Sequence, residues 1–344
     1  MISRCLPIGK RSFELRRQSA AATALSPVFL SVLRQRGTIL PVQTGYRLVR
    51  LPNGACSIRS LADGETFHPG IGPAAEAQAL YVRQLRLPQR VRESSGEFVI
   101  WDVGLGAAAN ALTAIRLIQE EPDGKSAQIR LLSFDHTRDA AAFALEHSRE
   151  LDYLYGFEAA LAELVRSRFV NFNAGPVRVA WTLELSDFPA WLVSARRDAA
   201  PTPIEPPHAI LFDPHSPRKN PAMWTASLFA DLFCRLDPQR PCALATFTRS
   251  TLARTALLLG GFFVGVGHPS GLKEETTMAA NRLELLDEPL DRRWLERAKR
   301  SDSAEPLAGS IYQRAPLAPA TWETLRRHPQ FQLRAGPNAP KLQA

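Results

Sequence analysis

Short apolar runs alternate with segments of helical periodicity through the middle of this 344-residue chain. Seven runs have the length of buried strands, at residues 98–103, 129–134, 177–182, 209–212, 243–247, 262–266 and 276–281. Five amphipathic segments separate them, at residues 107–119, 138–147, 158–165, 224–236 and 252–259. Strands that are joined through helices pair in parallel, so the pattern predicts an α/β, doubly wound sheet of seven mostly parallel strands. Only a Gly/Pro/Ser loop joins the last two runs, which predicts a hairpin at the end of the sheet.

The composition predicts a sizeable core with charged ends. Hydrophobic residues make up 45% of the chain, and no apolar run approaches the roughly 20 residues that cross a bilayer, so we expect no membrane partner. Residues 1–40 hold seven Lys/Arg against Glu14 alone, and residues 291–344 hold ten against five acids. We divide the chain into a basic flexible extension (1–40), an N-terminal subdomain (41–95), the α/β domain (96–285) and a basic Pro-rich tail (286–344). The Arg/Ser/Ala-rich, acid-poor composition of the extension also resembles a transit peptide or an overextended start, and an arm that contacts phosphates is the alternative to a solvated tail.

The four cysteines give no sign of a metal or a disulfide framework. Cys5, Cys56, Cys234 and Cys242 lie far apart, without CxxC spacing and without a neighbouring histidine. We therefore expect a metal-free protein of the reducing cytoplasm. The sequence gives no indication of the oligomeric state.

An acid and two glycines follow the first predicted strand. Asp102, Gly104 and Gly106 stand where a strand ends and a helix begins, which is where open α/β sheets bind nucleotide-like ligands. Ala109 replaces the third glycine of a dinucleotide-binding GxGxxG motif. The pattern favours an S-adenosylmethionine or nucleotide site, and its structural alternative is tight packing of a strand against a helix.

Acidic residues also end the next two strands. Asp135 lies about 30 residues past the glycine turn, where a carboxylate can bind both hydroxyls of a ribose. Asp187 follows the third strand, at the usual position of an adenine contact. Each has an alternative role as a helix or loop cap.

The loop after the fourth strand carries the most specific signal. Asp213 opens it, and the residues from Pro217 to Trp224 lead into an amphipathic helix. A carboxylate beside a methyl donor suits methylation of an amine, because an alkylammonium must lose its proton before its nitrogen can attack. Asp213 is therefore the predicted catalytic residue, and capping of the following helix is the alternative.

The run Asp213-x-x-x-Pro217-x-Lys219-Asn220-Pro221 with Met223-Trp224-Thr225 resembles the methyltransferase domain of the MnmC family, which modifies the wobble uridine of tRNA. Further matches are Glu65-Thr66-x-His68, Glu76, Asn110 after the glycine turn, and 271–274. The resemblance covers about residues 42–283. It implies a class I, Rossmann-like methyltransferase fold that uses S-adenosyl-L-methionine, held by Glu76, Asp102, Gly104, Gly106, Asn110, Asp135 and Asp187.

The resemblance also implies a reaction. The family domain methylates the exocyclic amine of 5-aminomethyl-(2-thio)uridine, and its key carboxylate corresponds to Asp213. The segment after Asn281 is too short for the FAD-dependent oxidase half of bifunctional members, so we expect a stand-alone form.

Two motifs depart from the family pattern. Gly-x-Gly-Thr-Gly is replaced by residues 104–108, which lack the third glycine and the hydroxyl. Asp-Gly-Phe-Ala-Pro is replaced by residues 213–217, in which His215 stands at the aromatic position.

Side chains around this loop are predicted to bind substrate. They are His215, Arg218, Lys219, Asn220 and Lys273, and the arginines of 292–300 extend a phosphate track toward a tRNA anticodon loop. Two alternatives remain open. One is a methyltransferase of the same fold that acts on another amine, and the other is a noncatalytic RNA-binding relative.

Overall fold

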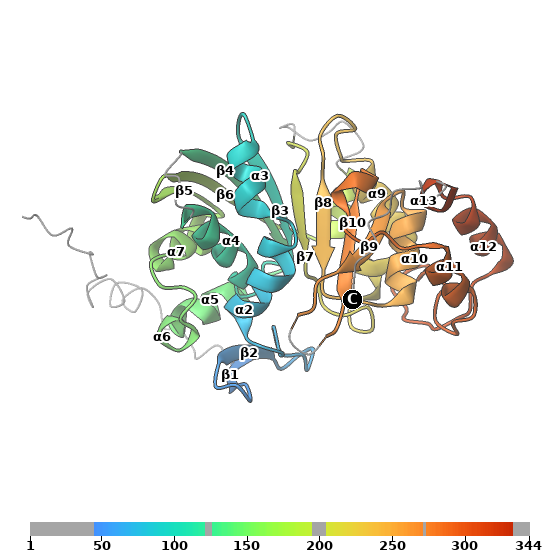
Figure 1. Ribbon diagram of the computed structural model, residues 1–344. Helices are drawn as coiled ribbons and strands as arrows, with labels where there is room; N and C mark the ends of the chain where they lie inside the picture. Colours follow the sequence, from blue (N-terminus) through green and yellow to red (C-terminus); the bar gives the residue numbers. More distant parts are fainter. Residues whose placement is uncertain (1–44, 121–125, 195–203, 271–272, 333–344) are drawn as a thin grey trace, which may run out of the picture. The chain divides into compact units, whose positions relative to one another are not determined.

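The computed structural model describes residues 45–120, 126–194, 204–270 and 273–332 (Figure 1). The predicted extension 1–40 lies outside the described residues, as do Gly271 and the last residues of the predicted tail. The described residues form one compact unit. No helix in the described part of the chain is both long and apolar enough to cross a membrane.

The described part of the chain builds its main sheet from eight strands. In spatial order they are β5 (Phe169–Ala174), β6 (Val177–Leu185), β4 (Ala127–Asp135), β3 (Phe98–Val103), β7 (Ala209–Phe212), β8 (Ala243–Thr246), β10 (Thr276–Ala280) and β9 (Phe263–Gly267). The five strands from β6 to β8 pair in parallel, whereas β10 runs antiparallel to both β8 and β9. The predicted doubly wound sheet and its terminal hairpin are therefore confirmed.

The prediction of seven strands was one strand short. The missing strand is β5, which pairs antiparallel with β6 at the edge of the sheet. Its side chains alternate between buried Val170 and Ala174 and exposed Phe169, Asn171 and Asn173. An edge strand with one solvent-exposed face alternates polar and apolar residues. It has no continuous apolar run, which is the pattern used here to predict strands.

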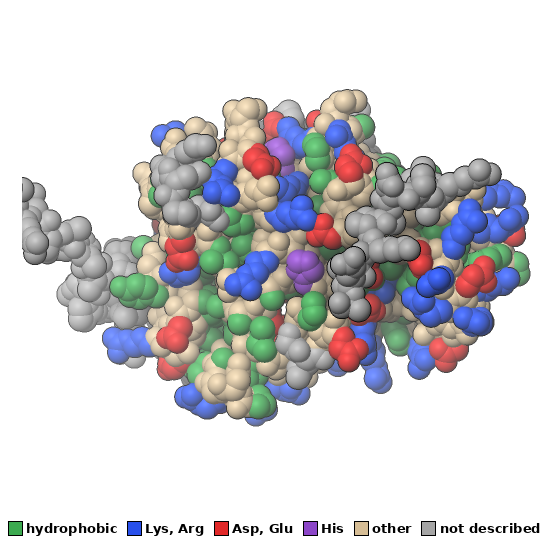
Figure 2. Space-filling view, viewed as in Figure 1, with side chains coloured by type: hydrophobic (Ala, Val, Ile, Leu, Met, Phe, Trp, Pro, Cys, Tyr) green, Lys and Arg blue, Asp and Glu red, His purple; other side chains and the backbone are tan. Residues whose placement is uncertain are grey.

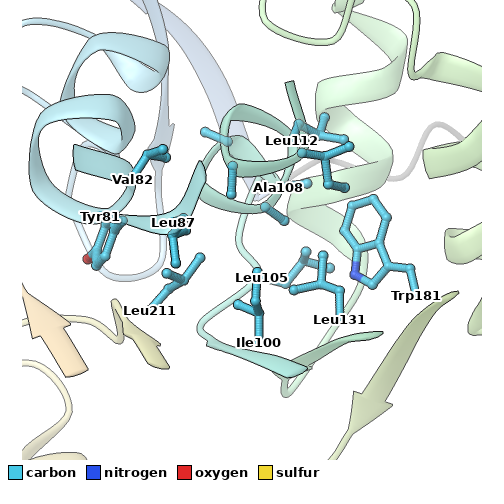
Figure 3. Close-up of a cluster of buried hydrophobic side chains, with 14 of the residues drawn as sticks. Tyr81, Val82, Leu87, Ile100, Leu105, Ala108, Leu112, Leu131, Trp181 and Leu211 are labelled. Atoms are coloured by element: carbon cyan, nitrogen blue, oxygen red, sulfur yellow. The ribbon is translucent and has the colours of Figure 1, made fainter. Parts of the chain in front are cut away.

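Helices cover both faces of the sheet. One layer contains α2 (Pro73–Ala77), the π-helical turn η1 (Gln78–Arg83), α3 (Leu87–Glu93), α4 (Ala109–Gln119), α5 (Asp139–Glu146), α6 (Ser148–Leu151) and α7 (Glu158–Ser167). The other contains α8 (Phe188–Ser194), η2 (Pro221–Trp224), α9 (Ala226–Phe233), α10 (Thr251–Leu259), α11 (Arg292–Lys299), α12 (Pro319–Arg326) and α13 (Pro329–Gln332). A short 3-10 turn, η3 (Leu283–Leu285), follows β10. Each layer has its own hydrophobic cluster, and Figure 3 shows Tyr81, Ile100 and Leu112 in the first.

The described chain beyond residue 286 packs against the main sheet. Trp294, Leu295 and Ala298 form the buried stripe of α11, with the spacing of one helix face. The side-chain amide of Gln330 accepts a hydrogen bond from the Val264 N–H and donates one to its carbonyl, both at 2.7 Å. These bonds cover the open edge of β9 together with the segment 288–290, which is hydrogen-bonded to Val264 and Val266.

A small hairpin lies beside one end of the main sheet. Its strands, β1 (Tyr46–Arg50) and β2 (Cys56–Ser60), pair antiparallel (Figure 1). The segment that follows β2 is anchored to it, because the Phe67 N–H donates to the Ile58 carbonyl at 2.8 Å. The residues after Phe67 are thereby fixed against the main sheet, where they help to line the cavity described next.

Candidate active site

A cavity of about 560 Å³ opens at the carboxyl ends of β3, β4 and β7. Its volume is that of a typical small-molecule site. Its lining combines the glycine turn, the ends of β4 and β6, the loop after β7 and the segment that follows β2. Of the predicted site residues, those that line it are Glu76, Gly104, Gly106, Asn110, Asp135, Asp213, His215, Lys219, Asn220 and Lys273.

The glycine turn lies directly against the loop that carries Asp213. Gly104 has φ +98°, and a Cβ there would lie 2.6 Å from the Asp213 carbonyl oxygen, so only glycine fits. The Asp213 N–H donates to the Val103 carbonyl at 2.8 Å, which holds the two segments together. The sequence predicted this glycine for ligand approach, and the structure adds a second reason, the close approach of another backbone.

Ala108 adopts the conformation that glycine favours. It stands where the family motif has its third glycine, and it has φ +63° and no exposed surface. A left-handed conformation costs a non-glycine residue about 1–2 kcal/mol. The backbone therefore keeps its left-handed conformation before α4 despite the substitution. The Ala108 N–H donates a hydrogen bond to the Leu105 carbonyl at 2.7 Å.

Asp135 and Asp102 occupy different environments. The Asp135 carboxylate lines the cavity and accepts hydrogen bonds from the N–H groups of Gly106 (2.8 Å) and Thr137 (3.3 Å). Burial raises the pKa of Asp135, and these backbone hydrogen bonds oppose that rise. Asp102 is fully buried in β3 and does not line the cavity. Its Oδ2 accepts from Ser133 Oγ at 2.7 Å, and burial raises its pKa to about 8.

Glu76 and Asp187, both predicted to bind the donor, differ in placement. Glu76 is buried against the cavity, where its Oε1 accepts hydrogen bonds from the N–H groups of Gly70 and Ile71. Asp187 is exposed and lies outside the cavity lining. Its Oδ1 accepts from the Ala190 N–H at 2.8 Å, so it fills the capping role that was its alternative. The neighbouring Ser186 and Phe188 line the cavity instead.

Three polar side chains meet on one side of the cavity. Asn110 Nδ2 donates to Asp213 Oδ2 at 2.7 Å, and His68 Nε2 lies 3.0 Å from Asn110 Oδ1 and 3.4 Å from Asp213 Oδ2. Burial lowers the pKa of His68, but its hydrogen bond with Asp213 and the charge of Asp213 outweigh burial, so the net pKa is raised. Sequence reasoning gave His68 no role, because its only signal was the family match.

The loop after Asp213 is bonded to the segment that follows β2. Ser216 Oγ donates to Glu65 Oε1 at 2.6 Å, and His215 Nδ1 lies 3.5 Å from Asp63 Oδ2. Lys273 donates to the Phe247 carbonyl at 3.1 Å, and its ammonium lies 4.3 Å from the centre of the Phe247 ring. Burial lowers the pKa of Lys273, which the charges of Asp213 and Glu76 oppose.

The remaining predicted substrate residue lies farther out. Arg218 is exposed and outside the cavity lining, whereas the adjacent Lys219 and Asn220 border the cavity. Among the described residues, no group of three or more His, Cys, Asp or Glu side chains is arranged to hold a metal ion.

Known proteins resemble this chain in sequence and in fold. The family described as S-adenosyl-L-methionine-dependent methyltransferase matches residues 159–282. A tRNA 5-methylaminomethyl-2-thiouridine biosynthesis bifunctional protein MnmC from Aeromonas hydrophila is 27% identical over 282 residues, which is 78% of this chain and 41% of that protein. Its counterpart from Ralstonia nicotianae is 28% identical over 228 residues, 63% of this chain and 32% of that protein. The chain thus spans less than half the length of these relatives.

A solved structure shares the fold. The crystal structure of MnmC2 from Aquifex aeolicus matches with a TM-score of 0.58 at 19% identity, over 83% of this chain and 85% of that chain. Together these findings confirm the resemblance, the class I methyltransferase fold and S-adenosyl-L-methionine as the methyl donor.

Proposed function

We propose that the S-adenosyl-L-methionine-dependent methyltransferase domain of this chain methylates the primary amine of 5-aminomethyl-(2-thio)uridine at the wobble position of tRNA. The observation that carries the proposal is the Asn110–Asp213 hydrogen bond of 2.7 Å, which fixes a carboxylate in the cavity beside the glycine turn. The names of the relatives, which describe tRNA 5-methylaminomethyl-2-thiouridine biosynthesis, support this substrate. A tRNA substrate also agrees with the expected cytoplasmic location.

The cavity lining suits the donor. S-adenosyl-L-methionine supplies a methyl group made electrophilic by the sulfonium that carries it. Gly104 and Gly106 leave backbone open to a ligand, and Asp135 offers a carboxylate to the ribose hydroxyls. Glu76 offers a second buried carboxylate to a cationic group of the donor. Asp102 lies inside the sheet, where it joins β3 to β4 through Ser133, and Ser186 and Phe188 line the cavity in place of Asp187.

Asp213 is the proposed catalytic residue. An alkylammonium has a pKa near 10, so at neutral pH the amine reaches the site protonated. Asp213 binds this ammonium, orients it and accepts one of its protons. The freed nitrogen lone pair then forms the new N–C bond as the S–C bond breaks, and the sulfur keeps that electron pair as a neutral thioether. Alignment of the nitrogen with the methyl group contributes most of the rate, and proton transfer contributes about 10²–10⁴-fold.

Basic side chains at the cavity support an anticodon loop as the partner. Lys219 and Lys273 line the cavity, and Arg218 and Arg249 are exposed in adjacent loops. None of the four forms an ion pair with an acidic side chain in the described part of the chain, and the three that are exposed, Arg218, Lys219 and Arg249, are open to phosphates. Figure 2 shows further Lys and Arg side chains over α11 and α12, with acidic side chains between them. Arg292, Arg293 and Arg297 of α11 are exposed.

The test combines donor binding with methyl transfer. Calorimetric titration of S-adenosyl-L-methionine should show a single binding site. Labelled methyl should then reach tRNA that carries 5-aminomethyl-(2-thio)uridine, and the same tRNA without the aminomethyl group should remain unlabelled. Donor binding with transfer only to small amines, or with no transfer at all, would contradict the proposed substrate.

A further inference from the structure

Asp213 is held by one of its two oxygens. Asn110 Nδ2 and His68 Nε2 both approach Oδ2, at 2.7 and 3.4 Å. Among the described residues, no hydrogen bond of normal geometry reaches Oδ1, although Asp213 lines the cavity and the buried Tyr81 hydroxyl lies near its carboxylate. The arrangement leaves Oδ1 for a ligand and uses Oδ2 as the anchor.

The hydrogen-bond pattern fixes the proton on His68. A carboxylate only accepts hydrogen bonds, so the Asn110 amide must turn its nitrogen toward Asp213 and its oxygen toward His68. His68 Nε2 therefore carries a hydrogen, which it shares between Asn110 Oδ1 and Asp213 Oδ2. Nδ1 is buried and has no hydrogen-bond partner in the described part of the chain. The neutral ring is thus oriented entirely through Nε2.

The backbone around His68 holds this geometry. His68 has φ +47°, a conformation that non-glycine residues rarely adopt and that is found where surrounding structure enforces it. The preceding Phe67 is bonded to β2 through its N–H and its carbonyl, and Glu76 Oε1 accepts the Gly70 N–H on the other side. The backbone is thus held at Phe67 before His68 and at Gly70 after it, which restricts movement of the imidazole away from Asp213.

We propose that His68 is a positioning residue for Asp213, which with Asn110 ties down Oδ2 so that Oδ1 meets the amine substrate. The charged and titratable groups that act on His68 are Asp213, Glu76 and Asp102. The buried hydroxyl of Tyr81 also interacts with Asp213, which adds to the rise that burial causes in the pKa of Tyr81. Asp213 carries the dominant favourable contact among them. The inference rests on the proposed function for its kinetic consequence, but the His68–Asp213 pair can be tested without any substrate.

The substrate-free test is an NMR titration of the labelled imidazoles in the whole protein. In the wild-type protein, His68 should be the Nε2–H tautomer when neutral, with a pKa above the ordinary value. Asp213→Asn should lower that pKa, because burial then acts without the opposing charge. An Nδ1–H tautomer, or a His68 pKa that is unchanged in Asp213→Asn, would overturn the proposal. His147→Gln, at a half-exposed histidine outside the cavity, should remove only its own signals.

The kinetic test separates positioning from folding. His68→Leu should lower kcat by about 10- to 100-fold, the effect expected when one hydrogen bond to a charged group is lost. It should leave the KM for S-adenosyl-L-methionine unchanged. His68→Gln, which keeps a side-chain N–H, should recover part of the loss, whereas equal kcat values for the two variants would contradict positioning. A wild-type protein that methylates no tRNA would refute the proposed function and leave the NMR result to decide on His68.

Discussion

The Asn110 amide donates to Asp213 Oδ2 at 2.7 Å and joins the first turn of α4 to the loop after β7. This bond connects the two predicted halves of the site, because α4 begins at the glycine turn and Asp213 carries the proposed chemistry. The Asp213 N–H is bonded to the Val103 carbonyl, so both its backbone and its side chain are held. The same few contacts therefore hold together the two segments in which the donor and amine sites are proposed.

Asp213→Asn should abolish most of the turnover and spare donor binding. The variant keeps the size of the side chain but cannot accept the proton of the ammonium, so kcat should fall by about 10²–10⁴-fold. The dissociation constant of S-adenosyl-L-methionine, measured by calorimetry, should stay within about threefold of wild type, which is under 1 kcal/mol. Full activity in the variant would show that the catalytic carboxylate lies elsewhere.

Asp135→Asn should weaken donor binding. Hydrogen bonds to a charged group contribute about 1.5–3 kcal/mol, so losing the ribose contacts should raise the dissociation constant about 10- to 100-fold. At saturating donor, kcat should change little. Asp187→Asn is the informative comparison, because Asp187 is exposed and engaged with α8, and we expect a much smaller effect. Equal losses in the two variants would argue against the ribose assignment.

Replacing the rim charges should reduce the salt dependence of tRNA binding. The double change Arg218→Gln and Lys219→Gln removes two exposed cations, and each lost phosphate contact flattens the slope of log K against log salt by about one unit. Arg130→Gln is a matched control, since Arg130 lies away from the cavity and pairs with Glu97. A slope that is unchanged in the double variant would exclude these two side chains from the RNA contact.

Periodicity predicted the sheet because its central strands are buried on both faces. β3 and β7 have no exposed position, so β7 is a continuous apolar run and β3 is interrupted by Asp102 alone. Edge strand β5 has no continuous apolar run, because its Asn171 and Asn173 are exposed to solvent, and it was therefore not predicted. Asp135 and Asp213 were predictable because the carboxyl ends of parallel strands meet at one edge.

Contacts between distant segments could not be read from the sequence. His68 and Asn110 lie 42 residues apart and meet only because the segment after β2 folds across the end of the sheet. Asp187 and Phe188 are neighbours in the chain, yet only Phe188 reaches the cavity, because Asp187 is drawn to the start of α8. The backbone path of a loop decides which of two adjacent side chains faces the cavity. A short loop has no regular hydrophobic pattern from which that path could be predicted.

Asp102 should make the folded protein less stable as the pH rises. Burial raises its pKa from 3.8 to about 8, so between these values the folded protein holds a proton that the unfolded chain lacks. Stability should then fall by up to about 1.4 kcal/mol per pH unit and level off above the folded pKa. Asn resembles the protonated side chain and does not titrate. Asp102→Asn should therefore lose less Tm than wild type between about pH 5 and about pH 8. Asp302→Asn, at an exposed aspartate, should follow the wild-type curve, and parallel curves for all three proteins would contradict the buried-proton assignment.

Ala108 and Ala109 provide a matched test of the altered glycine turn. Both are buried, but Ala108 has φ +63° whereas Ala109 begins α4. Glycine at 108 relieves about 1–2 kcal/mol of left-handed strain, which offsets its greater chain entropy and the lost methyl contact. Glycine at 109 relieves nothing and should cost about 1 kcal/mol or more. Urea unfolding should therefore find Ala108→Gly more stable than Ala109→Gly by at least about 1 kcal/mol, with donor binding retained. If both variants lost the same stability, Ala108 would not be strained, and the turn would follow a path that needs no glycine.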